Sequence, residues 1–159
     1  VTSNPSFIGF AQPHNKGHVA AALKFSAASP NEKAGLTAMA NENHFYYLAQ
    51  SVKDGKPAVE LYKDSNIIAS KTISLKSKQP LYLKIEANKG TNSFYYATSE
   101  NKWQLLLANA DGKYLSTKGA GGFVGVLYAM YATSNGLASN SKAIFNWFEV
   151  KNEDDVYKK

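Results

Sequence analysis

Short runs of strand-forming residues recur along the whole chain, and clusters rich in Gly, Pro and Asn separate them. In residues 81–86, apolar and polar side chains alternate strictly, which is typical of a strand with one buried face and one solvent face. Turn signals such as Asp54-Gly55 and Lys89-Gly90 fall between such runs. No segment of helical length has a convincing 3.6-residue period. The sequence predicts strands at residues 7–12, 18–25, 34–40, 44–52, 58–62, 81–87, 93–98, 103–107, 124–132 and 143–150.

About ten short strands in a chain of 159 residues predict a single all-β domain, a sandwich of two antiparallel sheets. Hydrophobic residues make up 44% of the chain, which is enough to fill the core of such a sandwich. The sequence shows no internal repeat and no linker. We expect the sandwich to occupy residues 1–151 and the charged residues 152–159 to form a frayed C-terminal tail.

The charge and residue usage argue against several classes of partner. The formal net charge is +6, and all 18 basic residues are lysines scattered along the chain. Base readout and bidentate phosphate contacts depend largely on arginine, so no nucleic-acid partner is predicted. No run of about 18 apolar residues occurs, so no membrane partner is predicted either. The chain has no cysteine and therefore no disulfide or thiolate metal site.

The acidic residues do not form the pair of facing carboxyl groups that glycoside hydrolysis requires. Asp54, Asp64 and Asp111 fall in predicted turns, and Glu86 lies on the solvent side of its predicted strand. The chain also lacks a Gly-x-Ser-x-Gly nucleophile motif and a phosphate-binding loop. We therefore predict no catalytic residue in this chain.

Two histidines lie close together near the N-terminus. His14 and His18 flank a turn-forming Asn-Lys-Gly run, so they do not share a helix face as paired zinc ligands do. We predict no metal site and no cofactor, although a structural calcium ion held by oxygen ligands stays open. Gln12 and His14 both carry groups that hydrogen-bond a hydroxyl, so they are candidate sugar contacts, with local turn packing as the alternative.

Aromatic clusters are the richest candidate feature. In Phe45-Tyr46-Tyr47 and in Phe94-Tyr95-Tyr96, strand alternation sends the middle residue to the face opposite its neighbours. One member of each cluster must then face outward or into a groove, where its ring can stack on a sugar. Cross-strand aromatic pairing is the alternative. The candidate rings for such a groove are Tyr46, Tyr95 and Trp103.

A glycine-rich loop carries one further candidate ring. Phe123 lies in the run Gly121-Gly122-Phe123-Val124-Gly125, just before a long apolar strand. Glycines adopt backbone angles that side chains forbid, so such a loop can present Phe123 to a ligand. The alternative is that Phe123 caps the core of the sandwich.

Five segments in order carry a family resemblance. Together they resemble the C-terminal concanavalin A-like domain of family 43 glycoside hydrolases, the β-xylosidase and α-arabinofuranosidase type, which is also treated as a xylan-directed carbohydrate-binding module. The chain departs from the family pattern at Phe10-Ala11, where arginine is usual, at Val124 and at Asn146. The five segments are residues 6–14, residues 34–37 with 41–48, residues 94–103, residues 121–136 and residues 144–149.

The resemblance implies a concanavalin A-like jelly roll that is not an enzyme by itself. In such enzymes the catalytic carboxylates lie in an N-terminal five-bladed β-propeller, which this chain does not contain. The resemblance further implies that the domain packs on the propeller of the same polypeptide. It also implies that Phe123 reaches the active-site mouth and favours short substrates. The expected substrate is xylan or a xylo-oligosaccharide, and the expected location is extracellular or periplasmic in a bacterium.

Two other functions stay open at this point. The chain could be an independent carbohydrate-binding module that holds polymeric xylan on a sheet face. It could also be a structural or protein-interaction sandwich without any sugar contact. A groove lined by exposed aromatic residues favours the first of these two functions, whereas a flat apolar patch around Phe123 favours an accessory domain.

The resemblance gives a test at Phe123. In the isolated chain, Phe123→Ala should lower the free energy of unfolding by less than about 1 kcal/mol, because a ring at a loop tip is not a core ring. Truncation of a buried phenylalanine costs about 3–5 kcal/mol, so denaturant unfolding separates the two roles. In the intact enzyme the same change should slow turnover of short substrates. A loss of stability in the larger range would show that Phe123 belongs to the core.

Overall fold

The computed structural model describes residues 6–11, 16–41, 43–76, 78–115, 127–135 and 141–152, and these residues fold almost entirely into strands. This confirms the predicted all-β class. Within these ranges the elements are β1 (Ser6–Ala11), β2 (Lys16–Lys24), β3 (Lys33–Asn41), β4 (His44–Lys53), β5 (Lys56–Lys63), β6 (Asn66–Thr72), β7 (Leu81–Asn88), β8 (Thr91–Ala97), β9 (Gln104–Asp111), the short 3-10 helix η1 (Lys113–Leu115), β10 (Leu127–Thr133) and β11 (Ile144–Asn152).

Tight turns join the central strands into hairpins. Asp54 and Gly55, between β4 and β5, both have positive φ angles, 52° and 75°. Lys89 and Gly90, between β7 and β8, repeat the pattern with 47° and 88°. Two consecutive residues with positive φ give a two-residue turn whose twist matches that of the paired strands. The turn residues therefore bring β4 beside β5 and β7 beside β8. Both turns fall where the sequence carries turn signals.

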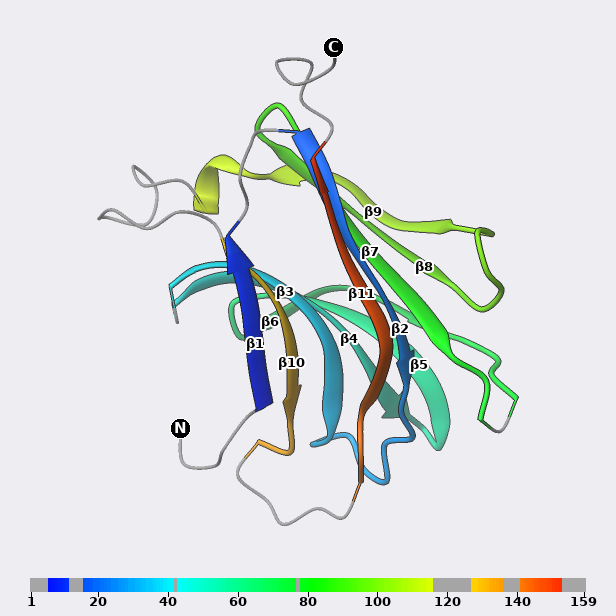
Figure 1. Ribbon diagram of the computed structural model, residues 1–159. Coiled ribbons are helices and arrows are strands. Elements are labelled where there is room, and N and C mark those ends of the chain that lie inside the picture. Colours follow the sequence, from blue (N-terminus) through cyan, green and yellow to red (C-terminus); the bar gives the residue numbers. More distant parts are fainter. Residues whose placement is uncertain are drawn as a thin grey trace.

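The strands form two antiparallel sheets that pack face to face (Figure 1). The six-stranded sheet has the order β1-β10-β3-β4-β5-β6, and the five-stranded sheet has the order β11-β2-β7-β8-β9. β10 lies between β1 and β3, and β11 pairs with β2. Segments from opposite ends of the chain are thus neighbours in both sheets, so neither sheet is complete until the last strand has been added.

Alternate residues of the strands fill the space between the two sheets. Leu81, Leu83 and Ile85 of β7 are fully buried, whereas Tyr82 and Lys84 between them are half-buried on the outer face. This is the alternation that the sequence predicted for residues 81–86. Each fully buried Leu, Ile or Phe contributes about 1.5–3 kcal/mol relative to exposure, so the inner faces dominate the stability. The largest fully buried side chains are Tyr46, Tyr128, Phe94, Leu23, Leu36, Leu48, Leu61, Leu81, Leu83, Ile85, Leu115 and Val19.

The helix η1 closes one end of the sandwich. Its last residue, Leu115, is 1% exposed and belongs to the core. The Gly112 amide donates to the Gly90 carbonyl over 2.9 Å, which ties the start of this segment to the β7–β8 turn. The Tyr46 hydroxyl, from the other sheet, donates to the Asp111 carbonyl over 2.9 Å. Both sheets therefore hold the closing segment in place.

The structure departs from the predicted strands in several details, and one part of the prediction is not tested. β6 was not predicted; it is an edge strand, and its Ile67 and Ile68 are 52% and 41% exposed, so no buried face marks it in the sequence. Asn152 pairs with Gly17 at the end of β11, so this strand includes the first residue of the expected tail. β10 is described from Leu127, and residues 124–126 of the predicted strand lie outside the described residues.

Gly35 offers a direct test of how closely β3 and β4 are packed. A Cβ atom at this position would lie 1.9 Å from the Leu48 carbonyl oxygen and 2.7 Å from the Ala49 Cα atom. Because both are backbone atoms, the strands themselves would have to move apart. Gly35→Ala should therefore lower the free energy of unfolding by about 2–4 kcal/mol, although alanine favours extended backbone more than glycine does.

Chemical denaturation of Gly35→Ala beside Thr72→Ala measures this effect. Thr72 is exposed at the end of β6, and its truncation should change the free energy of unfolding by no more than about 0.5 kcal/mol. Equal stability of the two variants would contradict the close strand approach.

Candidate functional site

The outer face of the five-stranded sheet presents a group of aromatic rings, which we name the ring platform: Tyr82, Tyr95, Trp103 and Trp147. The strand register brings these residues together. Trp147 on β11 lies opposite Ala22 on β2, and Ala22 in turn lies opposite Tyr82 on β7. Two residues further along β7, Lys84 lies opposite Tyr95 on β8. Trp103 immediately precedes β9.

The rings of the platform contact one another and share one cation. The centroid of the Tyr82 ring lies 6.1 Å from that of Trp147 and 6.5 Å from that of Trp103. The Lys84 Nζ atom lies 4.5 Å from the centroid of the Tyr95 ring and 4.7 Å from that of Trp103. A lysine ammonium over two aromatic faces is attracted by both ring quadrupoles. Lys84 therefore links the Tyr95 side of the platform to the Trp103 side.

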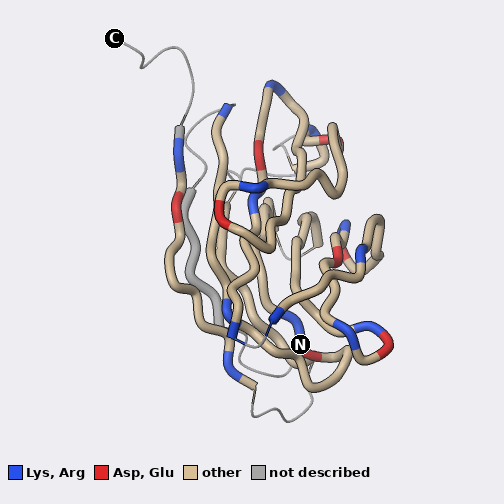
Figure 2. The backbone as a smooth tube through the Cα atoms, turned by 90° about the vertical axis from the view of Figure 1, so that its right-hand side faces the viewer, with Lys and Arg blue, Asp and Glu red and all other residues tan. Residues whose placement is uncertain are grey.

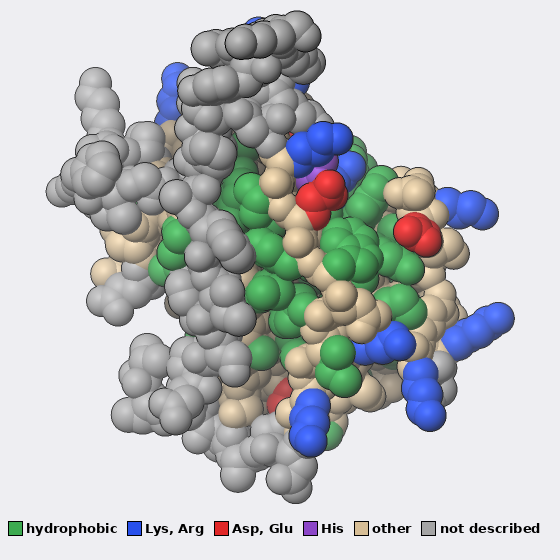
Figure 3. All heavy atoms as spheres, viewed as in Figure 1, with side chains coloured by type: hydrophobic (Ala, Val, Ile, Leu, Met, Phe, Trp, Pro, Cys, Tyr) green, Lys and Arg blue, Asp and Glu red, His purple; other side chains and the backbone are tan. Residues whose placement is uncertain are grey.

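Solvent reaches the platform from above, and small residues lie beneath it. Trp147 is 39% exposed, and Leu105, which pairs with Tyr95 in the register, is 54% exposed. Ala20 and Ala22 of β2 are almost completely covered. Figure 3 shows hydrophobic side chains gathered on this face, with lysines around them. This exposed aromatic surface is a candidate contact site for a ligand or a partner.

A row of polar and acidic residues bounds the platform along the strands. The His18 Nε2 atom lies 3.4 Å from the Glu149 Oε2 atom, and Glu86 lies opposite His18 in the register. Burial raises the pKa of the Tyr95 hydroxyl, and the nearby Glu86 carboxylate raises it further. The Tyr95 phenol is therefore neutral near pH 7 and available as a hydrogen-bond donor.

A β-bulge determines that Trp147 faces outward. The register of β11 shifts between Phe145 and Trp147, so that Asn146 is the extra residue. Before the bulge Phe145 packs against the core, and after it Phe148 and Val150 do so. Without the extra residue, Trp147 would share the inner face with Phe145. The bulge therefore switches the face on which β11 places its aromatic residues.

The structure unites two of the predicted sugar-contact residues and separates the third. Tyr95 and Trp103 lie together in the ring platform through Lys84. Tyr46 does not join them: it is 1% exposed, and its ring centroid lies 5.3 Å from that of Phe94 in the core. A ring that solvent does not reach cannot stack on a sugar, so the assignment of Tyr46 to an exposed groove is corrected to a core role.

Three other predicted residues, Gln12, His14 and Phe123, lie outside the described residues, and their assignments stay predictions. Two platform residues were not predicted as sugar contacts. The alternation of residues 81–86 places Tyr82 on the solvent face, and this signal alone would justify adding Tyr82 to the candidate sugar contacts. Trp147 could not be placed from alternation, because the bulge changes the face on which β11 presents it.

The outer face of the six-stranded sheet carries a second aromatic group, the tyrosine cluster: Tyr47, Tyr62 and Tyr131. The Tyr47 and Tyr131 ring centroids are 5.2 Å apart, and the Tyr47 hydroxyl donates to the Tyr131 carbonyl over 3.0 Å. The Tyr62 hydroxyl donates to a Glu60 carboxylate oxygen over 3.1 Å. Burial is the main cause that raises the pKa of Tyr47 and of Tyr62. Two of its hydroxyls thus bind the protein itself, and the cluster stiffens the sheet.

The two buried carboxylates, Glu32 and Glu60, accept hydrogen bonds from other groups of the same chain. Glu60 is 8% exposed and accepts the Tyr62 hydroxyl, and burial lowers the pKa of the neighbouring Lys33 although the Glu60 charge opposes that shift. Glu32 is 6% exposed and accepts the Ala28 amide over 2.5 Å and the Ser141 hydroxyl over 2.8 Å. These contacts are structural and leave neither carboxylate facing an open cleft as an acid or a base.

The described residues contain neither a cluster of metal ligands nor a membrane-spanning helix. No group of three or more His, Asp or Glu side chains in those residues is placed to hold a metal ion. Within the same ranges, no helix has the length and apolar character needed to span a membrane. Figure 2 shows lysines and acids spread over turns and strand ends rather than gathered in one patch.

Comparisons with known proteins agree with this architecture. A family model described as the beta-xylosidase C-terminal concanavalin A-like domain matches residues 1–151. A non-reducing end alpha-L-arabinofuranosidase of Bacteroides ovatus is 28% identical over 150 residues, which are 93% of this chain and 28% of that protein. A xylosidase/arabinosidase of Butyrivibrio fibrisolvens is 31% identical over 156 residues, 94% of this chain and 29% of that protein. The chain thus spans less than a third of the length of these relatives.

Solved structures show the same fold. The Bacteroides ovatus xyloglucan PUL GH43B structure superposes with a TM-score of 0.82 at 28% identity, over 92% of this chain and 29% of that chain. A xylan beta-1,4-xylosidase of Bacillus halodurans superposes with a TM-score of 0.84 at 20% identity, over 94% of this chain and 30% of that chain. In both, the matching fold is again a minor part of a longer polypeptide.

Proposed function

Because the chain belongs to the family of beta-xylosidase C-terminal concanavalin A-like domains, we propose that it is the non-catalytic accessory domain of a glycoside hydrolase. The proposed substrates of that hydrolase are xylan and xylo- or arabino-oligosaccharides. One observation carries this proposal: nearly the whole chain aligns with less than a third of each curated relative. The larger remainder of each relative is long enough to contain the catalytic machinery.

The same observation supports a domain that packs on the catalytic domain of its own polypeptide. The resemblance of residues 121–136 to the family pattern supports a further assignment, in which Phe123 lies at the mouth of the active site and limits the pocket to short substrates. The contacts of the buried carboxylates support the non-catalytic part of the proposal. Glu32 and Glu60 are occupied by hydrogen bonds within the chain, and a glycosidase needs two carboxyl groups free to face the sugar.

The isolated chain should therefore hydrolyse neither aryl-xyloside nor aryl-arabinoside. Release of the aryl group is measured by absorbance, with the same chain joined to its catalytic domain as the positive control. Activity that co-purifies with the isolated chain and survives its repurification from a second expression host would contradict the proposal.

A second candidate function is the binding of a xylan chain on the ring platform. The observation that favours it is the exposure of Trp147 beside Tyr82 and Trp103 on one open sheet face. Sugar rings stack their C–H faces on aromatic rings, and the neutral Tyr95 hydroxyl adds a donor for a sugar hydroxyl. This binding is compatible with an accessory role, because a substrate chain held on the platform stays close to the catalytic domain.

Loss of the most exposed ring tests this second function. Xylohexaose should bind the chain with a dissociation constant of about 0.1–1 mM, because an open face offsets little of the ordering cost. Trp147→Ala should weaken that binding about 5–10-fold, which corresponds to the loss of one stacking contact. Calorimetry on this variant is compared with Ile68→Ala, which truncates an exposed side chain on β6. Equal affinities of the two variants would exclude the platform as the binding surface.

A further inference from the structure

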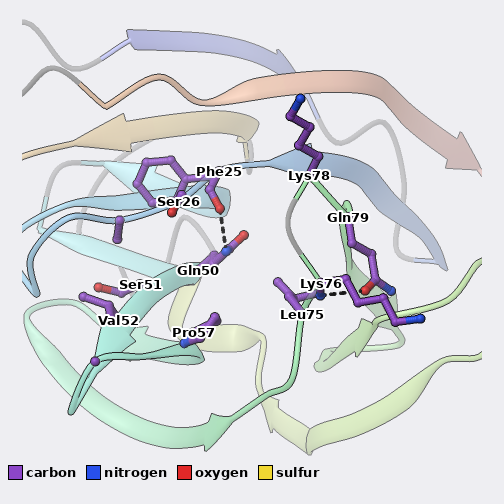
Figure 4. Close-up of a pocket in the computed structure, with 12 residues that line it drawn as sticks. Phe25, Ser26, Gln50, Ser51, Val52, Pro57, Leu75, Lys76, Lys78 and Gln79 are labelled. Atoms are coloured by element: carbon purple, nitrogen blue, oxygen red, sulfur yellow. Dashed lines mark hydrogen bonds between the residues drawn. The ribbon is translucent and has the colours of Figure 1, made fainter.

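A cavity of about 350 Å³ opens at one end of the sandwich, between the two sheets (Figure 4). Four segments line it: the connection after β2 at Phe25, the end of β4 at Gln50, the start of β5 at Pro57, and the connection before β7 at Leu75 and Gln79. Its volume lies at the lower end of the range for small-ligand pockets. None of the platform rings lines this cavity, so it is a separate site.

The cavity contains a buried hydrogen-bond acceptor that has no partner. Gln50 is 3% exposed, and its Nε2 group donates to the Phe25 carbonyl over 2.7 Å. Its Oε1 atom has no hydrogen-bond partner among the described residues. In Figure 4 the amide oxygen points into the cavity. A buried carbonyl without a donor loses its hydration without any compensating hydrogen bond, so this atom favours a ligand that brings an O–H or N–H group.

The walls around Gln50 are firmly held before any ligand arrives. The Gln79 side chain accepts the Lys76 amide over 2.9 Å and donates to the Thr98 carbonyl, which fixes the connection before β7. The Ile73 amide donates to the Pro57 carbonyl over 2.9 Å, which ties this connection to β5. A site that is preformed in this way loses little conformational entropy when it binds.

The chemistry of the walls limits the class of ligand. Phe25 and Leu75 are apolar and pack against the core, and no Asp or Glu is present among the residues that line the cavity. This lining does not suit a metal ion or a cationic ligand. Lys76 and Lys78 line the rim, but their side chains extend away from Gln50 in Figure 4. Ser26, Ser51 and Gln79 also line the cavity, so its interior combines apolar and neutral polar groups and carries no acidic residue.

We propose that this cavity binds one neutral sugar ring. A ring hydroxyl donates to the Gln50 Oε1 atom, and the C–H face of the ring lies against Phe25. The site is distinct from the ring platform and does not depend on the accessory role proposed above. A free monosaccharide and the terminal residue of an oligosaccharide share this chemistry, and both are included as ligands in the test.

Two-dimensional NMR of the 159-residue chain with D-xylose as the probe tests the proposal. We expect a dissociation constant in the millimolar range and a shift of the Gln50 side-chain amide resonances, which a remote site would not move. Gln50→Met removes the acceptor and should weaken binding at least about tenfold. Because this change also removes the bond to the Phe25 carbonyl, a thermal melt checks that the variant is folded.

A second variant keeps Gln50 and blocks the cavity instead. Ser26 lines the cavity and is exposed, so Ser26→Trp should abolish binding while the melting temperature stays unchanged. The matched control is Ser70→Trp, an exposed position on β6 that does not line the cavity. Trp147→Ala should leave the D-xylose shifts of the Gln50 amide unchanged, because Trp147 belongs to the platform and does not line the cavity. This result does not depend on whether the platform binds sugar.

The remaining outcomes decide between ligand sources or overturn the proposal. When binding is followed by the Gln50 side-chain amide shifts in the Trp147→Ala variant, tighter binding of xylotetraose than of D-xylose assigns the cavity to a chain terminus. The reverse order assigns the cavity to the free monosaccharide. Salt-sensitive preference for D-glucuronate would overturn the neutral class. No shift of the Gln50 amide at 100 mM D-xylose would show that only water contacts the Gln50 carbonyl. Equal shifts in Ser26→Trp and Ser70→Trp would show that the sugar binds elsewhere.

Discussion

The apolar faces that the two sheets bury against each other fix the register of the strands, and the outer faces depend on that register. Leu81, Leu83 and Ile85 are completely covered, so a slip of β7 by one residue would expose all three and bury Tyr82 and Lys84 in their place. The position of the ring platform is therefore a consequence of core packing. No interaction within the platform needs to be strong for its rings to stay together.

The phase of alternation decides whether an aromatic residue is a core residue or a surface residue. Tyr46 and Tyr95 occupy the middle of nearly identical three-residue clusters, and the sequence treats them alike. In β4 the middle residue faces the core, whereas in β8 the middle residue faces outward and Phe94 and Tyr96 are buried. Local sequence fixes which residues share a face, but only the partner strands fix which of the two faces is covered.

Much of the fold could be predicted because its signals are local. Alternation identified the strand at residues 81–86, and the Asp54-Gly55 turn signal identified the break between β4 and β5. Edge strand β6 was not predicted, because an exposed strand needs no apolar face. Trp147 was not predicted as a surface ring, because the bulge at Asn146 changes which residues of β11 face outward. The cavity at Gln50 could not be predicted at all. Its walls come from four connections and strand ends that are distant in sequence, and no local sequence pattern indicates that these segments lie side by side.

The ring platform and the cavity at Gln50 offer a sugar different kinds of binding energy. On the platform, rings such as Trp147 stay hydrated until a ligand covers them, and stacking depends little on the arrangement of sugar hydroxyls. In the cavity, the Gln50 carbonyl is already withdrawn from solvent at 3% exposure, so a ligand recovers part of a cost that folding has imposed. That recovery requires a hydroxyl at one position. The platform therefore suits an extended chain of varied decoration, whereas the cavity discriminates between single rings by the direction of one O–H group.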